Sequence, residues 1–127
     1  FKAQELQPLK AEQLKYDKSG LIPAVIQDYR NGAVLMVGYM NQEAVNRTSA
    51  SGKVCFWSRS RQEYWVKGET SGNIFQVKSI NADCDADALL IKVIPQGAGV
   101  ACHTGSYSCF FNNLAAYDPE KRGDLDD

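Results

Sequence analysis

Three of the four cysteines stand where thiol chemistry is possible, and the single histidine follows one of them. Cys102 and Cys109 enclose a loop with His103 at its start, and Cys84 lies between two aspartates. Three thiolates and a water would form a tetrahedral zinc site with one open position, and such a site lowers the pKa of the water to about 7. His103 is suited to proton transfer because a free imidazole titrates near about pH 6.5. The alternative is that these thiols are small buried groups, as we expect of Cys55 in its apolar run, and that His103 is a loop residue.

Asp83, Asp85 and Asp87 alternate with Cys84 and Ala86 in one short segment. If this segment is an extended strand, its three carboxylates share one face and repel each other unless a cation lies between them. Carboxylate oxygens are ligands of Mg²⁺ and Ca²⁺, but the Gly and the Glu of an EF-hand loop are missing. The segment therefore predicts either a magnesium site or an acidic turn between strands.

Arg59, Arg61 and Lys67 belong to a basic stretch that also contains both tryptophans. In a strand the two arginines would share a face and could clamp a phosphate. The polar turn 68–73 follows, and its two glycines allow backbone N–H groups to face an anion. The alternative is that the charges protect solvated strand edges and that each tryptophan is a core residue. An anion-binding stretch beside the cation-binding segment 83–87 suits a small polyanionic ligand.

Six β-rich segments and one helical segment must position these residues. Strands are predicted at 21–29, 33–39, 53–58, 64–67, 74–80 and 88–94. The pair Asn31-Gly32 predicts a tight turn between the first two strands. Asn41 is a candidate N-cap for a helix over 41–51 that ends at Gly52. Residues 97–109 form a predicted loop that holds the histidine and two cysteines.

This pattern predicts one domain over residues 1–127, mainly β with α+β character and with one or two short helices. Residues 1–16 are expected to form an N-terminal arm, with a short helix or irregular structure over 4–16. Residues 112–127 are expected to form an acidic C-terminal tail.

The chain of 127 residues carries 14 Lys+Arg and 15 Asp+Glu, for a formal net charge of −1. This balance argues against a nucleic-acid partner, because general nucleic-acid binders are basic. No apolar run approaches the ~20 residues of a membrane span, and the first ten residues hold no apolar signal core. We therefore expect no membrane partner and a cytoplasmic protein, in which reduced cysteines serve as metal ligands, catalytic groups or core residues.

The motifs WSRSR, KGETSGN, DCDAD and CHTG…SCFF occur in this order between about residues 21 and 111. Together they resemble phosphoribosyl-AMP cyclohydrolase, a family of histidine biosynthesis. The resemblance implies a hydrolase that opens the adenine ring of 1-(5-phosphoribosyl)-AMP between N1 and C6, giving the phosphoribosyl-formimino-AICAR-phosphate intermediate. It further implies Zn²⁺ and Mg²⁺ as cofactors and an intertwined homodimer of β-rich half-barrels. Because only sixteen residues follow Phe111, we expect the monofunctional form.

The resemblance also assigns roles to individual residues. The implied zinc ligands are Cys84, Cys102 and Cys109. The implied magnesium ligands are Asp83, Asp85 and Asp87. The candidates for substrate binding are Arg59, Arg61, Lys67, Glu69, Thr70, Ser71, Gly72 and Asn73. The zinc site would be shared between subunits, with Cys84 from one chain and the loop pair from the other, and His103 would move protons during attack by zinc-activated water.

Two other classes of function use the same residue types. A zinc-stabilised nucleotide-binding module would unfold on chelation and would turn over no nucleotide. A zinc nucleobase deaminase is chemically close, but its H-x-E…P-C-x-x-C signature is absent from the sequence. A deaminase would release ammonia, whereas ring opening would not.

Overall fold

The computed structural model describes residues 8–115 and residue 120. The main sheet has the strand order β2-β1-β6-β5, and a separate two-stranded sheet is formed by β3 and β4. The strands are β1 (Ile22–Asp28), β2 (Val34–Met40), β3 (Cys55–Ser58), β4 (Glu63–Val66), β5 (Phe75–Ala82) and β6 (Leu89–Pro95). All six predicted strands are confirmed, and so is the mainly β fold class.

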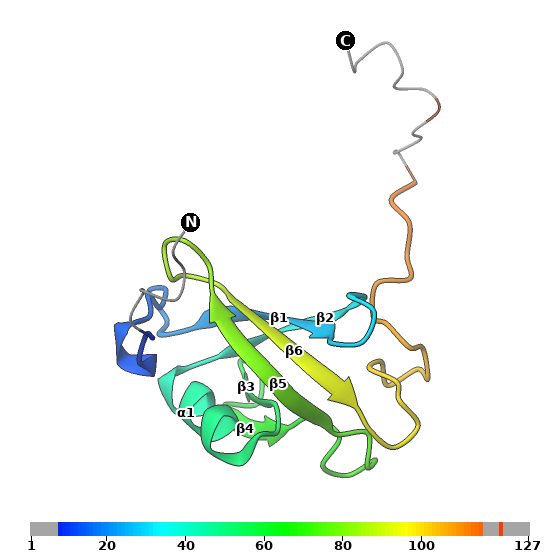
Figure 1. Cartoon of the computed structure of the whole chain (residues 1–127), viewed down its shortest axis with the longest axis horizontal. Helices are drawn as coiled ribbons and strands as arrows, with labels where there is room; N and C mark the ends of the chain where they lie inside the picture. Colours follow the sequence, from blue (N-terminus) through cyan, green and yellow to red (C-terminus); the bar gives the residue numbers. More distant parts are fainter. Residues whose placement is uncertain (1–7, 116–119, 121–127) are drawn as a thin grey trace.

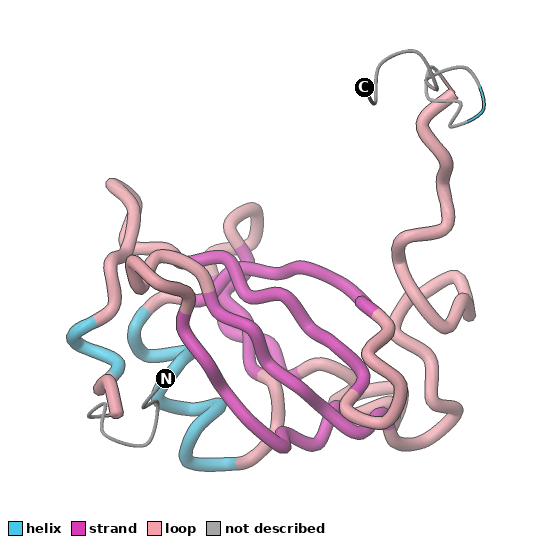
Figure 2. Tube along the Cα trace, turned by 45° about the horizontal axis from the view of Figure 1, so that its top comes forward, coloured by secondary structure: helices cyan, strands magenta, loops and turns pink. Residues whose placement is uncertain are grey.

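The central strands β1 and β6 alternate strictly between buried and half-buried side chains. Their inward side chains form the core with α1 (Gln42–Ser51) and the β3–β4 hairpin, which pack on one face of the sheet. Figure 2 shows the helical segments in cyan to one side of the strands in magenta. The period of two along each strand therefore determines which face is buried.

Helix α1 begins and ends where the sequence predicts. The Asn41 side chain accepts a hydrogen bond from the Ala44 N–H at 2.9 Å, and Gly52 ends the helix in the left-handed region at φ 73°. Inside the helix, the buried Thr48 hydroxyl accepts the Cys55 N–H at 3.0 Å and contacts the Cys55 carbonyl oxygen at 3.2 Å. This pair of bonds attaches the helix to β3 and satisfies polar groups that have no water.

The pairing of β1 and β6 places the candidate site residues at two ends of the sheet. The two strands run parallel, from Ala24 beside Leu89 to Asp28 beside Val93. The acidic turn, residues 83–88, therefore lies at the start of β1, and the thiol loop, residues 101–109, lies near its end (Figure 1). Because a strand rises about 3.3 Å per residue, the length of β6 separates these ends by about 20 Å.

The terminal segments are described only in part. Within the predicted arm 1–16, residues 1–7 lie outside the described residues, and Ala11–Gln13 form the short 3-10 helix η2. Within the predicted tail 112–127, residues 116–119 and 121–127 lie outside them. The single domain over 1–127 and the intertwined dimer of half-barrels stay predictions. None of the helices in the described ranges has the length and apolar character needed to cross a membrane.

Candidate functional site

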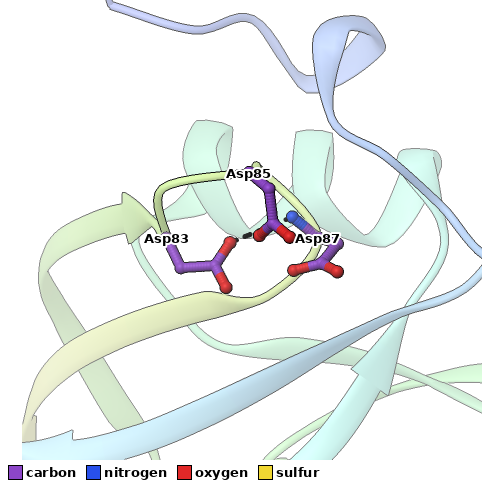
Figure 3. Close-up of side chains that lie close together, drawn as sticks. All are labelled: Asp83, Asp85 and Asp87. Carbon is purple, nitrogen blue, oxygen red and sulfur yellow. Dashed lines mark hydrogen bonds between the residues drawn. The ribbon is translucent and has the colours of Figure 1, made fainter.

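The acidic turn brings three carboxylates together. Asp83, Asp85 and Asp87 each offer an oxygen within 4.8 Å of the others, and all three residues are exposed (Figure 3). The Asp83 carboxylate accepts the backbone N–H of Asp87 at 3.0 Å and that of Ala88 at 3.3 Å. Ala86 adopts a left-handed backbone at φ 62°, which closes the turn. The shared face was predicted for an extended segment, and that prediction is wrong. A turn brings these carboxylates together instead.

Hydrogen bonds, desolvation and repulsion between carboxylates shift the pKa of Asp83 and of Asp87. A hydrogen bond with Asp85, desolvation and the nearby Asp83 raise the pKa of Asp87 to about 6. Desolvation of Asp83 acts in the opposite sense to its hydrogen bonds from Asp87 and Ala88, and the net effect lowers the pKa of Asp83. A divalent cation among three oxygen donors would remove this repulsion, so the donor set fits Mg²⁺.

The thiol loop brings two further donors together. Cys102 and Cys109 lie close enough to shift the pKa of each other's thiols, and the Thr104 hydroxyl donates to the Cys102 sulfur at 3.1 Å. The bonds from Thr104 lower the pKa of Cys102, whereas burial and the neighbouring Cys102 raise the pKa of Cys109. The positive charge of Lys67 acts to lower the pKa of both thiols. Two adjacent thiols of this kind fit part of a zinc ligand set.

His103 lies in the same loop, directly after Cys102, and is exposed. Within the described part of the chain, no hydrogen bond holds its imidazole. The ring is therefore available to a ligand bound beside the thiols, and its role in proton transfer stays a prediction.

Cys84 does not join the other two thiols within one chain. It is exposed on the acidic turn, at the far end of β6 from Cys102 and Cys109. The carboxylates of the acidic turn are the one cluster of three or more potential metal donors among the described residues. A single described chain therefore assembles two of the three implied zinc ligands. Cys55 is 2% exposed in the core, and burial raises its pKa, as expected of a packing residue.

Lys67 and the turn 68–73 lie at the same end as the thiol loop. Lys67 is half-buried, and its ammonium nitrogen lies 5.8 Å from the ring centroid of Phe75. The Asn73 side chain accepts the Ala98 N–H at 2.8 Å, which joins the turn to the segment that follows β6. The candidates at exposed positions of the turn are Glu69, Thr70, Ser71 and Gly72.

Arg59 and Arg61 lie in the turn between β3 and β4 rather than in a strand. Arg59 stacks over the Tyr39 ring, 4.1 Å from its centroid, and Arg61 pairs with Glu63 at 3.4 Å. The prediction that the two arginines share one face of a strand is therefore wrong. A cavity of about 370 Å³ is lined by Ser19, Leu21, Asn41, Trp57, Arg59 and Gln62. Because it borders the start of β1, this cavity lies toward the acidic-turn end of the sheet.

Two residues near the thiol loop were missed by the sequence analysis. Asp28 is 1% exposed at the end of β1, and its carboxylate accepts the Tyr107 hydroxyl at 2.5 Å. The guanidinium of Arg30, together with this hydroxyl, keeps the pKa of Asp28 far below its usual range despite desolvation. An aspartate at the end of an apolar strand pattern is a signal for a buried, partnered carboxylate, but the pattern does not identify a partner 79 residues away in the sequence.

The fold and these donor sets define a small β-rich protein with candidate carboxylate and thiolate metal positions at opposite ends of one sheet. Comparison with known families is more specific. The sequence model described as "Phosphoribosyl-AMP cyclohydrolase" matches residues 36–111, a segment that contains every site residue predicted from the sequence. The chain belongs to the phosphoribosyl-AMP cyclohydrolase family.

Individual relatives agree with this assignment. A phosphoribosyl-AMP cyclohydrolase of Bifidobacterium longum is 59% identical over 106 residues, which cover 84% of this chain and 79% of the relative. One of Pelotomaculum thermopropionicum is 54% identical over 107 residues, covering 84% and 81%. A histidine biosynthesis bifunctional protein HisIE of Thermosynechococcus vestitus is also 54% identical over 107 residues, but these cover 50% of its length.

Proposed function

We propose that this protein is a hydrolase of histidine biosynthesis that opens the adenine ring of 1-(5-phosphoribosyl)-AMP between N1 and C6. Membership of the phosphoribosyl-AMP cyclohydrolase family supports this activity and a small phosphorylated nucleotide as its substrate. Thiols that act as metal ligands must stay reduced, so we further propose that the protein works in the cytoplasm.

The observation that carries the proposed active site is the separation of its two halves. The acidic turn holds Cys84 at one end of the sheet, while Cys102, Cys109 and His103 lie at the other. A zinc site with all three thiols then requires two chains, with Cys84 from one and the thiol loop from its partner. We therefore propose a homodimer with composite sites between its subunits.

The uncovered face of the main sheet supports a dimer independently. Val25, Leu90 and Ile94 are half-buried and alternate with the buried core residues, so they belong to the face opposite α1. Across the described residues, α1 and the β3–β4 hairpin pack on the other face only. A second chain over this face would remove its apolar side chains from water.

The residues of the chain divide the chemistry among them. When bound, zinc supplies a water of lowered pKa and magnesium supplies positive charge toward phosphate oxygens. The exposed imidazole of His103 takes a proton from the attacking water or gives one to a ring nitrogen. Substitution at N1 makes C6 electrophilic, so the water oxygen bonds to C6 and the C6–N1 bond breaks, with its electron pair and a proton going to N1. Lys67 and the backbone N–H groups of turn 68–73 balance phosphate charge at the thiol end, and Arg59 does so at the other.

The experiment that tests this proposal combines metal analysis with an absorbance assay on 1-(5-phosphoribosyl)-AMP, before and after chelation. We expect turnover without ammonia release, loss of turnover on chelation, and recovery when Zn²⁺ and Mg²⁺ are restored. Ammonia release would instead indicate a deaminase, and zinc binding without turnover would indicate a binding module.

Two variants at cysteines make the same experiment specific. Cys102→Ser is expected to lose zinc and activity together, because it removes one member of the thiol pair. Cys55→Ala is the matched control, since this thiol packs in the core, and it should keep both. An active, zinc-free Cys102→Ser enzyme would contradict the proposed zinc ligation.

A further inference from the structure

The thiol loop is held to the main sheet by a buried carboxylate that lies outside the proposed chemistry. Asp28, the last residue of β1, has a fully buried side chain. One of its oxygens accepts the Arg30 Nε–H at 3.0 Å, and the other accepts Arg30 Nη2–H at 2.8 Å and the Tyr107 hydroxyl at 2.5 Å. A buried carboxylate is costly unless such donors satisfy it, so the native state strongly favours an arrangement in which Tyr107 stays in place.

Tyr107 transmits this restraint to the backbone of both cysteines. Its carbonyl oxygen accepts the Ala101 N–H at 3.1 Å, and the carbonyl oxygen of the preceding Ser106 accepts the Cys102 N–H at 3.1 Å. On its other side, the Cys109 N–H donates to the Leu35 carbonyl oxygen at 2.8 Å. Cys102 is therefore hydrogen-bonded to the residue that precedes Tyr107, and Cys109, two residues after Tyr107, is held to β2.

The remaining donors at this position point to the same restraint. The Asn31 amide donates to the Tyr107 hydroxyl at 3.1 Å from the β1–β2 turn. The Ser108 hydroxyl donates to the Val34 carbonyl oxygen at 2.8 Å, at the start of β2. The loop has no regular strand pairing of its own, so side-chain bonds of this kind determine its shape.

We propose that Asp28 and Tyr107 are positioning residues for the thiol pair Cys102–Cys109. Their hydrogen bond fixes the thiol loop against the end of β1 and sets the separation of the two sulfurs for a shared metal ion. This inference rests on the proposed zinc ligation. In this proposal Tyr107 acts through the backbone of the thiol loop, and its hydroxyl contacts Asp28 and Asn31.

Tyr107→Phe is the variant that tests this role. It removes one hydroxyl from a side chain that is 37% exposed and leaves the ring in place, so the fold is expected to persist. Tyr29→Phe is the matched control, because it also removes one tyrosine hydroxyl, from a residue next to Asp28 in the sequence that is 55% exposed. Asp28→Asn and the double variant Asp28→Asn/Tyr107→Phe complete a cycle that measures the coupling between the two groups.

The primary measurement is the zinc dissociation constant of the full-length protein, by competition with a chelator. We expect Tyr107→Phe to weaken zinc binding by about tenfold and Tyr29→Phe to leave it unchanged. The double variant should bind zinc no more weakly than the weaker single variant, because both changes break one contact. The visible absorption of bound Co²⁺ should shift in Tyr107→Phe, and kcat should fall while KM changes by less than about twofold.

Each outcome separates this inference from the proposed function. Equal zinc affinities for wild type and Tyr107→Phe would overturn the positioning role, even if the variant unfolds at a lower urea concentration. Additive losses of zinc affinity in the double variant would also overturn it. A wild-type protein that binds no zinc would refute the proposed metal centre and this inference together.

Discussion

Mixing two inactive variants should restore about a quarter of the wild-type activity if the active site is shared between chains. Cys84→Ala breaks the acidic-turn half of the site, and Cys102→Ala breaks the thiol-loop half, at opposite ends of the sheet. Random exchange of equal amounts gives about one half heterodimers. Each heterodimer combines the intact acidic turn of one chain with the intact thiol loop of the other at one of its two sites. One intact site in half of the dimers corresponds to about 25% of full activity.

The assay is turnover of 1-(5-phosphoribosyl)-AMP after the two variants are unfolded and refolded together, with heterodimer content measured by mass spectrometry. The matched control mixes Cys102→Ala with Cys109→Ala, which both damage the thiol loop. Every site of that heterodimer contains a damaged loop, so it should stay inactive. No activity in the first mixture, despite about one half heterodimers, would refute the shared site. Equal recovery in both mixtures would do so as well.

Three further changes test single features of the structure. His103→Ala should keep its zinc and lose kcat by ~10²–10⁴-fold if the imidazole moves protons, which metal analysis and steady-state kinetics check together. Because the pKa of Asp87 is raised to about 6, protons compete with Mg²⁺ for this carboxylate below that pH. Calorimetry should show the Mg²⁺ affinity falling roughly tenfold per pH unit below pH 6, and Asp87→Asn should flatten this pH dependence. Gly68 has a left-handed backbone at φ +81°, and Gly68→Ala would place a methyl group against the backbone of Asn73. This variant should lose about 3 kcal/mol of unfolding free energy, measured in urea. Gly72→Ala, equally left-handed at φ +82° but without a neighbour within 4 Å, should cost about 1 kcal/mol.

Local signals in the sequence predicted most of the fold. The helix was found because Asn41 caps it and Gly52 ends it, and both act within one turn of the chain. The strands were found because alternation along 22–28 and 89–95 reflects burial of one face. The proximity of Cys102 and Cys109 was also within reach, since one short loop joins them.

Contacts between distant segments could not be read from the same signals. The three carboxylates were expected to share one face if segment 83–87 were a strand. The segment is a turn instead, because the Asp83 carboxylate accepts the Asp87 N–H and Ala86 has a left-handed backbone. Arg59 and Arg61 were expected to share a face of a strand, but Arg59 stacks on the ring of Tyr39, which belongs to another strand. Each of these outcomes depends on backbone geometry or on a partner that periodicity does not identify.

The separation of donors has a consequence for how the proposed site forms. The thiol pair has the positive charge of Lys67 near it, and the acidic turn has three exposed carboxylates. In the proposed dimer these ends face each other, and attraction between Lys67 and the carboxylates favours the pairing that brings Cys84 to the thiol loop, whereas two acidic turns would repel each other. A lone chain brings only two of the three implied zinc-ligand thiols together, so zinc binding and dimer formation strengthen each other. Removal of zinc should therefore weaken the dimer, and dilution that dissociates the dimer should weaken zinc binding, because the two equilibria are linked.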